Sequence, residues 1–82
     1  MPTILIVEDK ESMAGMLTQA LEAEGYSTLH AKDGGEGIQL FKDKKVDLVL
    51  TDLKLPQKDG LQVLAVVKAH NPLTPVIMMT AY

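Results

Sequence analysis

The sequence predicts an α/β fold, a doubly wound parallel sheet flanked by helices, and three observations carry that prediction. Runs rich in apolar residues at 3–7, 46–52 and 76–79 are typical of strands that are covered on both faces. Segments with helical spacing of apolar residues lie between these runs. The connections are short, so only right-handed crossovers on a parallel sheet fit them. The expected order is strand, helix, strand, helix, strand, helix, strand.

Composition limits the chain to one small domain spanning residues 1–82. It is 46% hydrophobic and 23% charged, with a formal net charge of -3. The chain has no cysteine, which excludes disulfides, thiolate metal sites and thiol nucleophiles and favours a cytoplasmic location. No apolar run approaches the roughly 18 residues of a membrane span, and no Lys/Arg cluster offers a site to nucleic acid. We therefore expect binding to neither membrane nor nucleic acid.

Polar residues follow each of the three apolar runs. Glu8 and Asp9 follow Thr3–Val7, the second run ends at Asp52, and the third run delivers Thr80 to its end. In parallel sheets flanked by helices, ligands bind in the crevice beyond the carboxyl ends of the strands. We expect Asp52 at this rim, too exposed for the protein interior to neutralise it.

The first helix and the strand after it are expected between residues 11 and 31. Met13, Met16 and Leu17 recur at helical spacing and are read as core residues rather than as part of a cofactor site. Gly25 stands where a left-handed residue would close this helix. The partly polar run 26–31 fits an edge strand, and its lone histidine, His30, is read as a surface residue.

Two further helices are marked by their capping residues. Asp33 and Glu36 form a capping-box pattern, and Asp59 with Gln62 forms another that opens a helix ending before Asn71-Pro72. Gly37 lies inside the second helix, where glycine costs about 1 kcal/mol relative to alanine. We therefore expect the second helix to be the least stable element.

The rim predicts metal-assisted phosphoryl chemistry. Glu8, Asp9, Asp52 and Thr80 are expected to converge there, and three carboxylates so close together repel unless they are hydrated, protonated or bridged by a cation. Oxygen ligands without Cys or paired His favour Mg²⁺. A carboxylate beside Mg²⁺ can attack a phosphoryl group in line and form an aspartyl phosphate, with Thr80 as a hydrogen-bond donor to that group.

Three motifs together resemble the receiver domain of bacterial two-component response regulators: 7–9, 50–60 and 75–81. The resemblance covers the whole chain and implies a flavodoxin-like, CheY-like fold, phosphorylation by a sensor histidine kinase, and Mg²⁺ as cofactor. Residues 71–75 and 80–82 are most similar to receivers of NtrC-like enhancer-binding transcription activators. The implied roles are these: Asp52 is the phosphoacceptor, Asp9 a direct metal ligand, Glu8 a ligand through water, the Lys54 backbone carbonyl a third protein ligand, Thr80 the switch hydroxyl, and Ala81 the small residue that leaves room for its movement.

The resemblance also implies segments that do not occur in these 82 residues. A complete receiver continues through another helix, a fifth strand with a lysine that pairs with the phosphoryl group, and a last helix. Lys10, Lys54 and Lys58 do not occupy the position of that lysine. The fold is therefore expected to be incomplete, and this segment alone to be a poor phosphoacceptor without steady enzymatic turnover.

Two other readings stay open at this point. A phosphatase of the haloacid dehalogenase type also uses a strand-end aspartate, Mg²⁺ and a later threonine, but it needs a second acid two residues after the nucleophile, where this chain has Lys54. The other reading is an interaction module with a vestigial site.

The strand at Val76–Thr80 predicts self-association. In the strand order that the resemblance implies, this strand is a bare edge, apolar, free of charge and without an internal proline. One side of the first helix, which carries Met13, Met16 and Leu17, would also lack a cover. We expect a two-fold homodimer through this strand.

Overall fold

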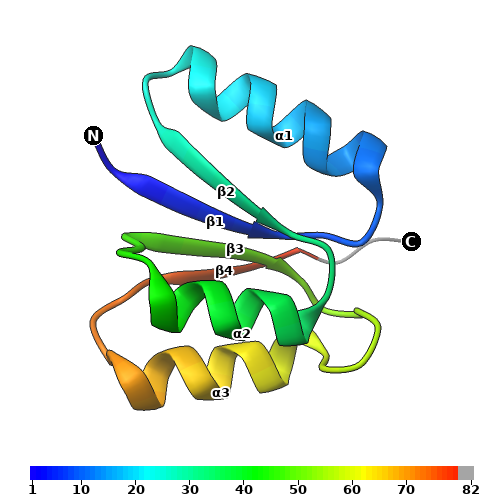
Figure 1. The fold of residues 1–82 in the computed structure, drawn as a ribbon, viewed down its shortest axis with the longest axis vertical. Helices are drawn as coiled ribbons and strands as arrows, with labels where there is room; N and C mark the ends of the chain where they lie inside the picture. The colour runs from blue at the N-terminus through cyan, green and yellow to red at the C-terminus, as the bar shows by residue number, and fades with distance from the viewer. Residues whose placement is uncertain (80–82) are drawn as a thin grey trace.

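The computed structural model describes residues 1–79, and Figure 1 shows a single parallel sheet between two layers of helices. The strand order is β2-β1-β3-β4, as the doubly wound prediction requires. α1 lies on one face of the sheet, and α2 and α3 lie together on the other. The elements in chain order are β1 (Thr3–Val7), α1 (Glu11–Ala23), β2 (Ser27–Ala31), α2 (Gly34–Asp43), β3 (Leu48–Asp52), α3 (Gly60–His70) and β4 (Val76–Met79).

The main core lies between the sheet and the α2–α3 layer. Alternate residues of a strand point to opposite faces, so Leu5, Val7 and Val49 point to this side. Val63 and Val67 of α3 meet them and are fully buried. This packing sets the register of β1 against β3, in which Val7 pairs with Thr51. The residues immediately after these two, Glu8 and Asp52, therefore leave the sheet side by side.

The predicted helix boundaries are largely confirmed. Gly25 has φ 93°, and its N–H donates to the Glu22 carbonyl at 3.0 Å, which closes α1 as expected. Asp59 and Gln62 make both hydrogen bonds of a capping box.

The capping box at α2 is only half right. The Asp33 carboxylate accepts from the Glu36 N–H at 2.8 Å. The Glu36 carboxylate, however, accepts from the N–H of Lys32 at 2.8 Å and so reaches one residue further back than the motif requires.

The reading of the α1 methionines as core residues is wrong for Met16, which is 60% exposed. Within the described residues α1 packs only on β1 and β2, so the side of α1 that faces away from them has no cover. Only Ala14 of this helix is fully buried. The expectation that this side of the helix stays uncovered is thus confirmed at Met16.

Gly37 has a packing role that helix propensity does not reveal. It is buried, and a Cβ added to it would lie 2.9 Å from Cγ2 and 3.1 Å from Cγ1 of Val7. Val7 is β-branched and has no exposed surface, so it cannot turn aside cheaply. The absence of a side chain at Gly37 lets α2 approach β1 closely. Helix propensity alone would count this glycine only as a loss of stability.

The substitution Gly37→Ala is expected to destabilise the fold by about 1–3 kcal/mol, the usual range for overpacking, although it improves helix propensity. The matched control is Gly15→Ala in α1, where an added Cβ meets nothing within 4 Å. That control should gain up to about 1 kcal/mol. Urea unfolding of both variants measures the difference, and a stability gain in Gly37→Ala would contradict the packing role.

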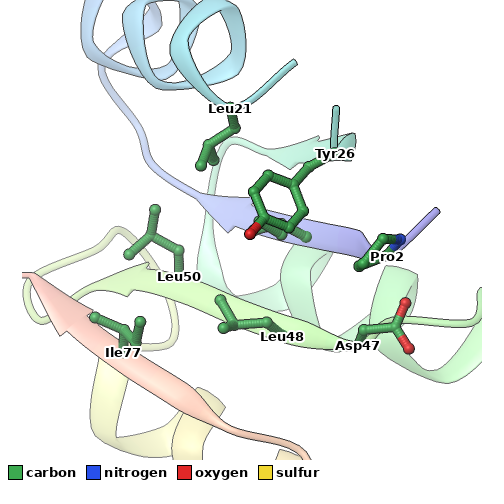
Figure 2. Close-up of a pocket in the computed structure, with 8 residues that line it drawn as sticks. Pro2, Leu21, Tyr26, Asp47, Leu48, Leu50 and Ile77 are labelled. Atoms are coloured by element: carbon green, nitrogen blue, oxygen red, sulfur yellow. The ribbon is translucent and has the colours of Figure 1, made fainter. Parts of the chain in front are cut away.

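The face of the sheet that carries α1 has a hollow of about 360 Å³ (Figure 2). Leu48, Leu50 and Ile77 border it, because α1 does not reach β3 or β4. Ile77 is 51% exposed on β4, which is an edge strand. The rest of the lining is Pro2, Ile4, Leu21, Tyr26 and Asp47. The hollow is therefore separate from the predicted carboxylate rim.

Candidate functional site

Three carboxylates meet beyond the carboxyl ends of β1 and β3, as the sequence predicts. Glu8, Asp9 and Asp52 each offer an oxygen, and these atoms all lie within 4.8 Å of one another. Glu8 and Asp9 continue directly from β1, and Asp52 is the last residue of the neighbouring strand β3. Two adjacent parallel strands thus assemble an acidic cluster at the edge where such sheets bind ligands.

The predicted exposure of Asp52 at the rim is wrong. Asp52 is 9% exposed and Glu8 only 2%, whereas Asp9 is exposed. The loop between β3 and α3 returns to the main chain of Asp52 at Gly60. Its first residue, Leu53, receives a hydrogen bond from the Gly60 N–H at 2.7 Å. Two of the three carboxylates are therefore largely withdrawn from water.

Glycines permit this loop to pack closely. A Cβ at Gly60 would overlap the carbonyl oxygen of Asp52, and a Cβ at Gly34 would overlap that of Lys58. Gln57 in the same loop has φ 67°, a left-handed conformation that is uncommon for a residue with a side chain. The loop that follows Asp52 is thus held against the amino-terminal ends of both α2 and α3.

Hydrogen bonds fix the main chain around Glu8. Its N–H donates to the Ala31 carbonyl at 2.9 Å, and its carboxylate accepts from the N–H of Lys10 at 2.9 Å. The carbonyl oxygen of Glu8 lies 2.8 Å from Nε2 of His30. His30 is exposed, as predicted, but its contact with the site was missed. The signal that could have found it is its position near the carboxyl end of the strand beside β1.

Burial raises the pKa of Glu8 from 4.5 to about 7. The Lys10 N–H acts in the opposite direction, since it stabilises the carboxylate. The neighbouring Asp52 raises the pKa further, because it repels the ionised form and hydrogen-bonds to the protonated form, and a hydrogen bond with Asp9 adds to this. Near neutral pH Glu8 is thus only partly ionised, and a bound cation would displace its remaining proton.

The metal-free protein is expected to lose stability as pH rises through 7. The folded pKa of Glu8 is above the unfolded value of 4.5, so between these values the folded state binds more protons. The free energy of unfolding should therefore be lower above pH 7 than at pH 5, by on the order of 3 kcal/mol. Urea unfolding in the presence of a chelator measures this loss.

Glu8→Gln is the control for this pH dependence, because it removes the titrating group and keeps the shape. The difference in stability between pH 5 and pH 8 should shrink in the variant. Adding Mg²⁺ at pH 8 should stabilise the unmodified chain more than the variant, which keeps Asp9 and Asp52 but lacks the charge of Glu8. Equal pH dependence in the two proteins would show that Glu8 does not titrate in this range.

The donor set fits a hard divalent cation. All three side chains offer carboxylate oxygens, which suit Mg²⁺ rather than a metal that prefers thiolate or imidazole. Lys54 lies two residues beyond Asp52 in the loop, and its carbonyl as a ligand stays a prediction. Thr80 and Ala81, predicted as the switch hydroxyl and its small neighbour, lie outside the described residues.

Residues 4–82 match the family described as the response regulator receiver domain. The regulatory protein AtoC of Escherichia coli is 40% identical over 79 residues, which are 96% of this chain and 17% of AtoC. The transcriptional regulatory protein PhoP of Bacillus subtilis is 36% identical over 78 residues, 95% of this chain and 32% of PhoP. The relatives include the NtrC-like regulators AtoC and GlrR, which agrees with the predicted subfamily. The chain thus spans a third or less of these curated relatives.

The solved structures that resemble this fold are also response regulator receivers. The response regulator TrrA of Thermotoga maritima, in complex with Mg²⁺–BeF, superposes with a TM-score of 0.95 at 32% identity and covers 100% of this chain and 71% of its own. A CheY-like receiver domain protein of Methanospirillum hungatei superposes with a TM-score of 0.96 at 34% identity. The match covers 100% of this chain and 66% of that protein. The comparisons do not support the phosphatase or the vestigial-module reading. The chain belongs to the receiver domain family of two-component response regulators.

Proposed function

We propose that this receiver accepts a phosphoryl group on Asp52 from a sensor histidine kinase, with Mg²⁺ held at the acidic cluster. The observation that carries the proposal is the meeting of three carboxylate oxygens within 4.8 Å at the ends of β1 and β3. Asp9 and Asp52 would bind the metal directly, Glu8 through water, and the Lys54 carbonyl would complete the protein ligands. Thr80 would donate a hydrogen bond to the phosphoryl group, and Ala81 would leave room for it.

The chemistry follows from the position of Asp52. Its carboxylate oxygen would attack phosphorus, a new P–O bond would form, and the bond from phosphorus to the donor would break, with its electron pair leaving on the donor. Bound Mg²⁺ would supply neutralising charge for the phosphoryl oxygens. Asp52 is 9% exposed, which limits the access of water to this group. The reaction is stoichiometric, and we expect no steady turnover.

Amide NMR tests the proposal. Addition of Mg²⁺ should shift the signals of Glu8, Asp9 and Asp52, and further addition of beryllium fluoride, the combination bound to TrrA, should shift Asp52 and its loop again. The probe does not need a cognate kinase. No response to either addition would contradict the proposal, and continuous hydrolysis of an aryl phosphate would support an enzyme instead.

We also propose a cytoplasmic location and a homodimer through the edge of β4. Relatives named as transcriptional regulators must reach DNA, which supports the location. Within the described residues no helix is long and apolar enough to cross a membrane. The dimer rests on the apolar edge strand and on the partly covered face beside it, where Ile77 is 51% exposed.

A further inference from the structure

His30 contacts the main chain of Glu8, the first residue of the acidic cluster. It is the penultimate residue of β2 and pairs in register with Ile6 of β1. Its side chain extends past the end of β1, where Nε2 lies 2.8 Å from the Glu8 carbonyl oxygen. A carbonyl oxygen can only accept, so Nε2 carries the proton and donates it.

This contact constrains more than Glu8 itself. The peptide group is planar, so the direction of the Glu8 carbonyl fixes the position of the N–H and the Cα of Asp9. β2 also accepts the Glu8 N–H, through the Ala31 carbonyl at 2.9 Å. The end of β2 therefore holds the Glu8 main chain at both its N–H and its C=O. The two consecutive carboxylates leave β1 in one set orientation toward Asp52.

We infer that His30 is a positioning residue for the metal site: its hydrogen bond orients the Glu8–Asp9 peptide so that both carboxylates converge on Asp52. The inference rests on the Mg²⁺ site of the proposed function. Without the bond, the chain after β1 has to be ordered when the cation binds, which lowers affinity. Losses of 10- to 100-fold are usual when a group that orients metal ligands is removed.

Two variants separate positioning from a general contribution to the fold. His30→Phe keeps a flat ring and removes the donor. His30→Gln keeps an N–H donor on a side chain of similar reach and should rescue the function. The matched control is Thr28→Val, which removes another side-chain hydrogen bond on the same side of β2, from Thr28 Oγ1 to Glu22 at 2.9 Å and away from the cluster.

The experiment is an Mg²⁺ titration of the unmodified chain and the three variants, with urea unfolding in parallel. We expect His30→Phe to weaken Mg²⁺ binding about 10-fold, His30→Gln to recover most of that affinity, and Thr28→Val to bind as the unmodified chain does. The carbonyl ¹³C signal of Glu8 in the metal-free protein supplies a readout that does not depend on Mg²⁺. It should move in His30→Phe and remain near its original position in His30→Gln and Thr28→Val.

The outcomes distinguish this inference from the proposed function. If the unmodified chain binds Mg²⁺ and His30→Phe binds it equally well, the positioning role is overturned and the proposed function stands. An equal loss of affinity in His30→Phe and His30→Gln also overturns it. If the unmodified chain binds no Mg²⁺, the proposed function fails and the role of His30 toward a metal fails with it. If the Glu8 carbonyl signal still moves in His30→Phe in that case, the hydrogen bond of His30 has a structural role only.

Discussion

Replacing Asp52 with asparagine is expected to abolish phosphoryl acceptance and to weaken Mg²⁺ binding, while making the metal-free protein more stable at pH 8. The first two losses follow because an amide is a poor nucleophile and carries no charge for the cation. The gain in stability follows because Asp52 is 9% exposed beside the buried Glu8 and disfavours the ionised form of Glu8, whose pKa is raised to about 7. Removing one of two close like charges should gain about 1 kcal/mol or more.

The same substitution should return the pKa of Glu8 toward its ordinary value. Burial remains the largest cause of the shift, but the repulsion from Asp52 is removed. Function and stability therefore oppose each other at this cluster, which is usual where a site needs like charges held together.

Asp43→Asn is the matched control for Asp52→Asn. It makes the same change of charge on an exposed carboxylate at the end of α2. Acetyl phosphate labelling followed by mass spectrometry should place any label at Asp52 and find none in Asp52→Asn. Calorimetric Mg²⁺ titration and urea unfolding complete the comparison. Unchanged Mg²⁺ affinity in Asp52→Asn, or an equal gain in stability from Asp43→Asn, would contradict the assignment.

The sheet could be predicted because parallel strands covered on both faces are nearly continuous apolar runs. The run at 3–7 contains only apolar residues after Thr3, and capping residues mark the helices between the runs. Packing between elements could not be read in this way. Gly37 breaks the rule of helix propensity and is explained only by its approach to Val7, 30 positions earlier in the chain.

The acidic cluster could be predicted because strand ends in a parallel sheet share one edge. Its electrostatics could not, because the burial of Glu8 and Asp52 depends on how the chain packs around the strand ends. The role of His30 depends on packing in the same way, and only its place near the end of the strand beside β1 hinted at it. The register pairs His30 with Ile6, and only the folded structure shows that its side chain reaches the carbonyl of Glu8.

Self-association is the second large effect expected of this chain. Val76 packs against the core on the α3 side, whereas Ile77 points to the face that carries the hollow and is 51% exposed (Figure 2). β4 has no charged residue and is one of the two edge strands of the sheet that residues 1–79 form. An antiparallel pairing of two β4 strands about a two-fold axis would pair the backbone N–H and C=O groups along this edge. It would also bring the two apolar faces next to each other.

Ile77→Lys should therefore weaken the dimer on the order of 100-fold, because two-fold symmetry places the substitution in the interface twice at roughly 1.4 kcal/mol each. Val76→Lys is the poorer test, since it would also disrupt the core. The matched control is Leu61→Lys, which alters a residue of similar exposure, 58%, on the opposite helical layer. Analytical ultracentrifugation at micromolar concentration should find dimers of the unmodified chain and of Leu61→Lys, and monomers of Ile77→Lys. A folded monomer of the unmodified chain would refute the β4 interface.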